Sequence, residues 1–240
     1  MNIYAIGDLH LSAVAGKPMG IFGQRWDNHC EKIAQAWRET VSPEDIVIIP
    51  GDISWAADFE EVLPDLRFIH ELPGRKILLK GNHEHWWSTL KKLNGLTAAY
   101  HLTSIDFLFN SCIYIEEKQV CICGTRGWQC PDRERTEEFS EQDDKIYKRE
   151  IIRLENSLKK AASYNGEIIA FMHYPPFNIH HESSGFTELL EKYKVTHCYY
   201  GHLHGPAQRW ALNGKLGSDS VTDFRLVSAD YLNFRPAFIL

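Results

Sequence analysis

Short apolar runs that stop abruptly at polar, metal-binding side chains are the feature of this sequence that most constrains its fold. Runs of strand length, almost continuously hydrophobic, occur at residues 2–7, 45–50, 76–80, 167–172 and 196–201. Continuous hydrophobicity, rather than alternation, is what a strand buried on both faces requires. The sequence therefore predicts buried, largely parallel strands, each followed by a polar turn.

Helical patterns separate several of these runs. Residues 27–39 place apolar side chains three and four positions apart, with Asp27 as the expected N-cap, and residues 144–162 repeat that spacing. Alternating strands and helices indicate parallel pairing with the helices outside the sheet. Residues 105–123 differ, because three close-set strand candidates follow one another without a helix, which predicts an antiparallel section. A further strand is expected within residues 224–236.

Composition limits the classes of protein that fit. The chain has 240 residues, of which 44% are hydrophobic and 24% charged, which favours a single α/β domain over residues 1–240. A formal charge of -6 without a basic block argues against binding an extended nucleic acid, and no apolar segment is long enough to span a membrane. Because no export signal is visible, we expect a cytoplasmic protein whose cysteines are reduced and mostly buried. The oligomeric state is left open.

Each buried strand candidate ends in side chains that can bind metals. Ligands gather at the carboxyl ends of parallel strands, so these exits should converge although they are far apart in sequence. Oxygen and nitrogen donors without thiolate suit manganese, iron, zinc or cobalt, and the donors are too many for one tetrahedral ion. A site for two metal ions would use all of them. They are Asp8, His10, Asp52, Asn82, His173, His202 and His204, accompanied by His83 and Glu84.

The ordered series D-x-H, G-D, G-N-H-E, H and G-H-x-H resembles the calcineurin-like metallophosphoesterase superfamily, over residues 8–204. The resemblance implies a four-layer αββα sandwich, in which two mixed sheets are flanked by helices. It also implies two divalent metal ions that share Asp52 as a bridge. One ion would be held by Asp8, His10, Asp52 and His204, and the other by Asp52, Asn82, His173 and His202.

The same resemblance implies hydrolysis of a phosphoric ester, either a phosphodiester or a small phosphomonoester, by a hydroxide that bridges the two ions. His83 would act as the general acid at the leaving oxygen, and Asn82 would also contact the substrate. Arg126, in the glycine-flanked stretch "GTRGW", is the best candidate for binding the phosphate. The expected partner is therefore a small phosphorylated substrate.

Two departures from the family's patterns bear on the branch. Glu84 is similar to the protein Ser/Thr phosphatase branch, but that branch also carries D-R-G after the bridging aspartate, which supplies an acid for the catalytic histidine. This chain reads "GDISWAAD", with Trp55 where that acid would be. The sequence is therefore closer to the bacterial phosphodiesterase-like branch. Three residues remain as candidates for orienting His83: Glu84, Asp58 and His85.

Two other functions are possible for this fold, and the sequence favours the enzyme over both. A non-catalytic interaction scaffold with this fold is expected to have lost ligands or the catalytic histidine, and neither is lost here. A nuclease that acts with a partner is expected to carry added basic surface, which the sequence lacks. Four tryptophans follow strand exits, and each either lines a substrate cleft or closes the core: Trp55, Trp86, Trp87 and Trp128.

Overall fold

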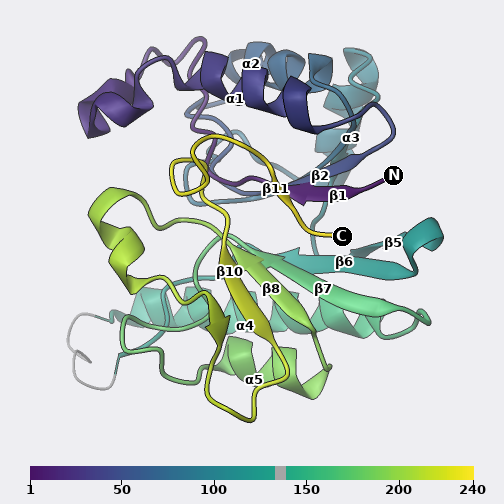
Figure 1. The fold of residues 1–240 in the computed structure, drawn as a ribbon, viewed down its shortest axis with the longest axis vertical. Coiled ribbons are helices and arrows are strands. Elements are labelled where there is room, and N and C mark those ends of the chain that lie inside the picture. The colour runs from purple at the N-terminus through teal and green to yellow at the C-terminus, as the bar shows by residue number, and fades with distance from the viewer. Residues whose placement is uncertain (133–138) are drawn as a thin grey trace. The chain divides into compact units, whose positions relative to one another are not determined.

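The computed structural model describes residues 1–132 and 139–240, and the chain in it divides into two compact units. The first unit comprises Met1–Phe107 with Val227–Leu240, and the second comprises Leu108–Leu226. Each unit is built on one mixed sheet with its own helices (Figure 1). No helix in the described ranges combines the length and apolar character needed to cross a membrane.

The first unit contains a five-stranded sheet in the order β11-β1-β2-β3-β4. Strands β1 to β4 are parallel to one another, and the edge strand β11 pairs with β1 in the antiparallel direction. Every residue of β1 and β2 is buried, as the apolar runs predict. The strands are β1 (Ile3–Ala5), β2 (Ile46–Pro50), β3 (Arg75–Leu79), β4 (Ile105–Phe107) and β11 (Ala237–Phe238).

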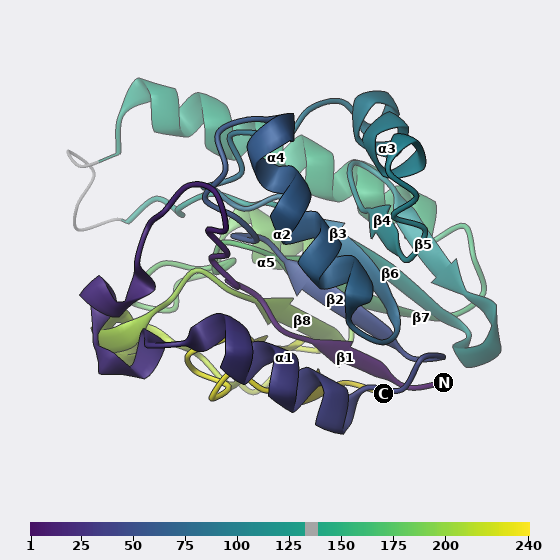
Figure 2. The same ribbon diagram turned by 90° about the horizontal axis from the view of Figure 1, so that it is seen from above.

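Three helices lie over this sheet, as the view from above shows (Figure 2). They are α1 (His29–Thr40), α2 (Phe59–Glu71) and α3 (Leu90–Ala99). Helix α1 buries Ile33, Ala34 and Trp37 of the predicted stripe, and the indole of Trp37 donates a hydrogen bond of 2.9 Å to the carbonyl oxygen of Pro73. Two short 3-10 helices, Met19–Phe22 and Gln24–Trp26, occupy the loop between β1 and α1.

The second unit contains a six-stranded sheet in the order β5-β6-β7-β8-β10-β9. Strands β6, β7, β8 and β10 are parallel, while β5 and β9 are antiparallel edges. Helices α4 (Glu141–Ala161) and α5 (Gly185–Lys192) cover it (Figure 1). The strands are β5 (Cys112–Ile115), β6 (Val120–Thr125), β7 (Glu167–Met172), β8 (His197–Tyr200), β9 (Gly214–Lys215) and β10 (Asp223–Leu226).

Three of the six cysteines are buried, whereas the sequence predicted that most of them would be. None of the six forms a disulfide, and Cys121, Cys123 and Cys198 are fully buried in the core between the second sheet and its helices. Burial raises the pKa of the Cys123 and Cys198 thiols well above their usual value, so both stay protonated.

Two local predictions are wrong. Asp27 is not the N-cap of α1, because the helix begins at His29 after Asn28, which adopts the left-handed conformation with a φ of 53°. Residues 105–107 do not belong to the antiparallel section: β4 pairs parallel to β3 in the first unit, because α3 provides a crossover that the sequence pattern did not reveal. Only β5 and β6 form the expected antiparallel pair.

Candidate functional site

The first unit places five predicted site residues at the exits of neighbouring parallel strands. Asp8 and His10 follow β1, Asp52 follows β2, and Asn82 and His83 follow β3. The three parallel strands thus deliver carboxylates, imidazoles and an amide to one edge of the sheet. The side chains of Asp8, His10 and Asp52 are almost fully buried, at 0%, 3% and 2% exposure. Buried charged groups need compensating partners, which a bound cation supplies.

Several of the predicted ligands have an uncommon backbone conformation. Positive φ angles occur at Asp8 (59°), His10 (47°), Asp52 (49°) and, in the second unit, His202 (71°). This left-handed region is sparsely populated by residues other than glycine, and such strain persists only where the surrounding structure fixes it. At these residues the backbone leaves the strand conformation, so each side chain points in a direction that a continuing strand would not give it. Side chains from separate strand ends can bind one metal centre only if the backbone changes direction in this way.

The loops after β2 and β3 fix each other through their carboxylates. The Oδ1 atom of Asp52 accepts hydrogen bonds from the backbone N–H groups of Asn82 and His83, at 2.9 and 3.0 Å. Gly81 allows this approach, because a Cβ atom there would collide with the backbone nitrogen and Oδ1 of Asp52. The G-N-H sequence thus orients the predicted bridging carboxylate with its backbone, in addition to supplying the side chains of Asn82 and His83.

Glu84, in the loop after β3, accepts hydrogen bonds from the loop after β2. Its fully buried carboxylate accepts hydrogen bonds from the N–H groups of Asp52 (3.1 Å), Ile53 (2.6 Å), Ser54 (3.4 Å) and Gly81. Burial raises the pKa of the Glu84 carboxyl to about 7, and the N–H donors oppose that rise. This carboxylate is therefore used to hold the backbone of both loops.

The imidazoles of the first unit surround the carboxylate of Asp52. The Nε2 atoms of His10 and His83 each lie 3.8 Å from its Oδ2 atom. Of the residues considered for orienting His83, Glu84 holds the loops, and Asp58 caps α2 by accepting from the N–H groups of Glu60 and Glu61 (2.9 and 3.0 Å). The third candidate, His85, is exposed.

The second unit supplies the remaining histidines. His173 follows β7, and His202 and His204 follow β8. The Nε2 atom of His173 lies 3.2 Å from Nδ1 of His202, and the N–H of Gly201 donates to the carbonyl oxygen of His173 at 3.0 Å. Two imidazole nitrogens this close can bind the same cation. The structure therefore brings together these two predicted ligands of one ion.

Arg126 lies beside that pair, at the end of β6. Its carbonyl oxygen accepts from the N–H groups of His173 and Tyr174, at 3.1 and 2.9 Å. The guanidinium lies 3.7 Å from the buried carboxylate of Glu150 and 4.6 Å from the ring centre of Trp128. Burial lowers the pKa of Arg126, and Glu150 opposes the change. Within the described part of the chain, neither its Nε nor its Nη2 finds a hydrogen-bond acceptor.

Comparison with known proteins identifies the family of this chain. The family model described as calcineurin-like phosphoesterase matches residues 1–206. The chain belongs to the calcineurin-like phosphoesterase family. The fold prediction is confirmed, since two mixed sheets flanked by helices are what this family's α/β sandwich requires. Divalent metal ions are implied by the family, while the assignment of individual ligands stays a prediction.

Relatives of this calcineurin-like phosphoesterase show the fold more than the function. Gene 66 protein of Mycobacterium phage D29 is 36% identical over 84 residues, which are 35% of this chain and 40% of that protein. Phosphopantetheinyl hydrolase from Mycobacterium tuberculosis is 15% identical with a TM-score of 0.58, covering 100% of this chain and 95% of the other. A protein of unknown function from Aquifex aeolicus is 16% identical with a TM-score of 0.50, over 99% and 95%.

The four tryptophans of this calcineurin-like phosphoesterase separate into two kinds. Trp86 and Trp87 are buried, and Trp87 packs edge-on against Phe107, so both close the core of the first unit. Trp55 and Trp128 are partly exposed and contact predicted site residues, Trp55 through His83 and Trp128 through Arg126. The sequence did not distinguish the two kinds.

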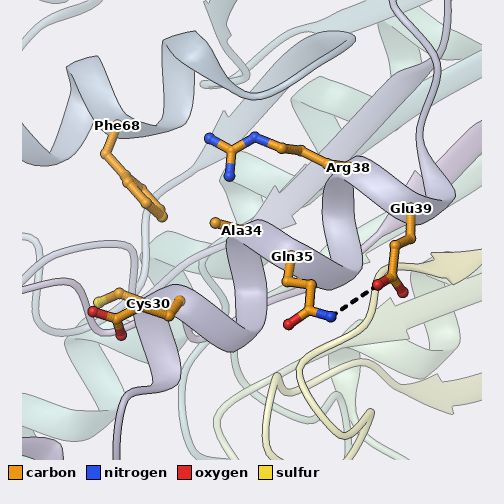
Figure 3. A pocket seen from close by; sticks show the side chains of 7 residues that line it. Cys30, Ala34, Gln35, Arg38, Glu39 and Phe68 are labelled. Carbon is orange, nitrogen blue, oxygen red and sulfur yellow. Dashed lines mark hydrogen bonds between the residues drawn. The ribbon is translucent and has the colours of Figure 1, made fainter.

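A hollow of about 680 Å³ in the first unit of this calcineurin-like phosphoesterase has none of the predicted ligands among its lining residues (Figure 3). Six of its lining residues belong to α1, and Phe68 of α2 faces them. Burial raises the pKa of the Cys30 thiol in this hollow to about 11, so it is a poor nucleophile at neutral pH. The residues are Cys30, Glu31, Ala34, Gln35, Arg38, Glu39 and Phe68.

Proposed function

We propose that the protein is a metal-dependent hydrolase of phosphoric esters with a dinuclear metal centre. The observation that carries the proposal is the ligand set itself: carboxylate, amide and imidazole donors at successive strand exits, four of them held in left-handed backbone conformations. Membership of the calcineurin-like phosphoesterase family supports the same chemistry. The bacterial branch is further supported by one protein of similar fold, the phosphopantetheinyl hydrolase from Mycobacterium tuberculosis.

The donor set fits two divalent ions of manganese, iron, zinc or cobalt. One would be held by Asp8, His10, Asp52 and His204, and the other by Asp52, Asn82, His173 and His202. Bound divalent ions lower the pKa of a coordinated water and neutralise charge on the phosphate oxygens, which is the chemistry that phosphoester hydrolysis requires. The interlocked loops keep the Asp52 carboxylate and the backbone of Asn82 in place for such ions.

The chain's own residues would handle the proton and the charge of the substrate. His83 lies beside Asp52 and would donate a proton to the leaving oxygen. The Asn82 amide would contact the substrate as well as a metal ion. Arg126 would bind a phosphate oxygen, because its buried Nε and Nη2 groups have no acceptor in the described residues.

The proposed substrate is small. A cavity of about 280 Å³ in the second unit is bordered by His202 and Tyr174, with apolar walls that include Phe177 and Ile179. This volume lies just below the usual range of small-molecule sites, which is roughly 300 to 1,000 Å³. The cavity therefore favours one compact organic group over a polymer. Phosphopantetheinyl conjugates, cyclic nucleotides and sugar phosphates belong in a substrate screen.

The direct test is hydrolysis of 4-nitrophenyl phosphate and bis(4-nitrophenyl) phosphate with manganese, before and after chelation, with metal content measured alongside. We expect turnover that chelation abolishes and manganese restores. Loss of general-acid catalysis in His83→Ala should lower kcat by about 10²- to 10⁴-fold while two ions remain bound. The exposed neighbour variant His85→Ala should stay within about twofold of wild type. A protein without metal-dependent turnover on either ester would overturn the proposal.

A further inference from the structure

Trp55 contacts two of the predicted site residues at once. Its ring centre lies 4.0 Å from that of His83, with the ring planes at 47°, and 5.0 Å from that of His10, with the planes nearly parallel at 25°. In the protein Ser/Thr phosphatase branch an acid is expected at this position, whereas here the neighbour of His83 is an aromatic wall. The indole thus restricts the imidazole through packing.

The indole is itself held from two sides. The backbone N–H of Trp55 donates to the carbonyl oxygen of Leu11 at 2.9 Å, and its Nε1 donates to Sδ of Met19 at 3.3 Å. Both acceptors belong to the loop between β1 and α1, and Met19 is buried. Because main chain and side chain are both anchored, the indole can serve as a fixed surface for His83.

Lys17, from the same loop, lies over Trp55. Its Nζ atom is 4.0 Å from the ring centre, although the residue is exposed. The loop that carries it is tied down, since Ser12 Oγ donates to the carbonyl oxygen of Lys17 at 2.9 Å and the N–H of Ala13 donates to Asp65 at 3.0 Å. Within residues 1–132 and 139–240 no carboxylate forms an ion pair with this ammonium group. A cation held only by an aromatic face keeps its capacity to bind an anion, since an exposed cation–π contact contributes about 0.5 to 1 kcal/mol.

We propose that Trp55 positions His83 and that Lys17, seated on Trp55, binds a phosphate oxygen of the substrate. The inference rests on the proposed function, because it gives the substrate's anionic group a second contact beside the general acid. Arg126 is already partly neutralised by Glu150, so Lys17 adds a positive charge that no described carboxylate offsets. A lysine acts as a point charge and makes no bidentate demand, so it suits monoesters and diesters alike.

Lys17→Met tests the phosphate contact, and Lys32→Met is its matched control. Lys32 is also an exposed lysine of the first unit over an aromatic ring, 5.5 Å from the centre of Phe234. In Lys17→Met we expect KM for 4-nitrophenyl phosphate and the inhibition constant of inorganic phosphate to rise about five- to tenfold, with kcat within twofold. Lys32→Met should change neither. If KM and the inhibition constant of phosphate are the same in Lys17→Met and Lys32→Met, Lys17 does not bind the phosphate.

Trp55→Leu and Trp55→Phe test the positioning of His83. The leucine variant removes the aromatic wall and should lower kcat at least about tenfold, with KM within twofold and both ions retained. The phenylalanine variant keeps a ring and should recover most of kcat, which a purely structural role would not require. If Leu and Phe variants are equally active, the positioning role is wrong. If Trp55→Leu fails to fold, Trp55→Met takes its place, and a kcat of Trp55→Met as high as that of Trp55→Phe would mean that the positioning role is wrong.

The inference and the proposed function fail in different ways. Wild-type protein that neither hydrolyses the two nitrophenyl esters nor binds inorganic phosphate in a calorimeter contradicts both. Wild-type protein that does both, while Lys17→Met and the Trp55 variants match it, contradicts the inference alone.

Discussion

The loops that follow β2 and β3 are joined by two carboxylates, Asp52 from the first loop and Glu84 from the second, each of which accepts hydrogen bonds from the backbone of the other loop. Asp52 accepts from two N–H groups of the second loop, and Glu84 accepts from three N–H groups of the first and from Gly81. Four buried donors converge on Glu84, so its charge is compensated by oriented N–H dipoles. A carboxylate used in this way says little about the branch of the family, because it holds the backbone and does not define the substrate.

Replacing Glu84 should therefore cost stability before it affects chemistry. Glu84→Ala leaves four buried N–H groups unsatisfied, and we expect the free energy of unfolding to fall by about 3 to 5 kcal/mol. Glu84→Gln keeps one acceptor oxygen and should lose less, about 1 to 3 kcal/mol. Denaturant unfolding measures both, with the exposed Glu44→Gln as the matched control. A Glu84→Ala variant as stable as Glu44→Gln would contradict the clamp.

The sequence predicted which residues lie at the strand exits but not what each side chain contacts. Asp8, Asp52 and His173 could be placed because each follows a buried run, and parallel strands bring such residues to the same edge of a sheet. The direction of the Glu84 carboxylate depends on the backbone path of two loops, which hydrophobic periodicity does not encode. The aromatic neighbour of His83 was missed for the same reason, although Trp55 in place of an acid was a visible signal.

Among the elements, α2 shows how a helix can be closed at both ends by side chains. Asp58 accepts from two N–H groups of its first turn. At the other end, the fully buried Lys76 of β3 donates through Nζ to the carbonyl oxygens of His70 (3.1 Å) and Leu72. A cation at a helix C-terminus also interacts favourably with the helix dipole. Desolvation nevertheless lowers the pKa of Lys76 to about 8.

This buried lysine predicts a pH dependence of stability. The folded-state pKa of about 8 lies below the usual 10.5, so the unfolded chain binds more protons between these values. Stability contributed through Lys76 therefore rises as pH increases from 8 to 10, by on the order of 2 kcal/mol. Lys76→Met removes this term, so the difference in unfolding free energy between the two proteins should change by that amount across the interval. Parallel curves for Lys76→Met and wild type would contradict the shifted pKa.

The strands were predicted more completely than the helices. Strands β2, β3 and β7 coincide with apolar runs, because a strand that is buried on both faces needs apolar side chains at almost every position. Helix α3 was missed, since its apolar stripe is short and Gly95 interrupts it. That omission is what misplaced β4, because without a crossover helix a parallel partner for β3 could not be inferred.

On the scale of the whole molecule, the predicted ligands extend from Asp8 to His204 and come from both compact units. The structure gives each unit its own sheet and core, so neither depends on a metal ion for its hydrophobic interior. Bound ions would add to this stability with the logarithm of their concentration, because they bind the folded chain in preference to the unfolded one. The buried acids Asp8 and Asp52 gain most, since a cation compensates the cost of burying their charge.

Thermal unfolding with and without metal should therefore separate the ligand set from the rest of the chain. At a metal concentration about 100 times the dissociation constant, the stabilisation is about 2.7 kcal/mol for each bound ion, which corresponds to a rise in Tm of about 5 to 10 °C per ion for a protein of this size. Asp52→Asn should lose most of this rise, because the proposed bridge touches both ions, whereas the exposed Asp219→Asn should keep it. The comparison uses the metal-induced shift of each variant, so a lower Tm of metal-free Asp52→Asn does not affect it. An equal shift in Asp52→Asn and Asp219→Asn would mean that the stabilising ions bind elsewhere.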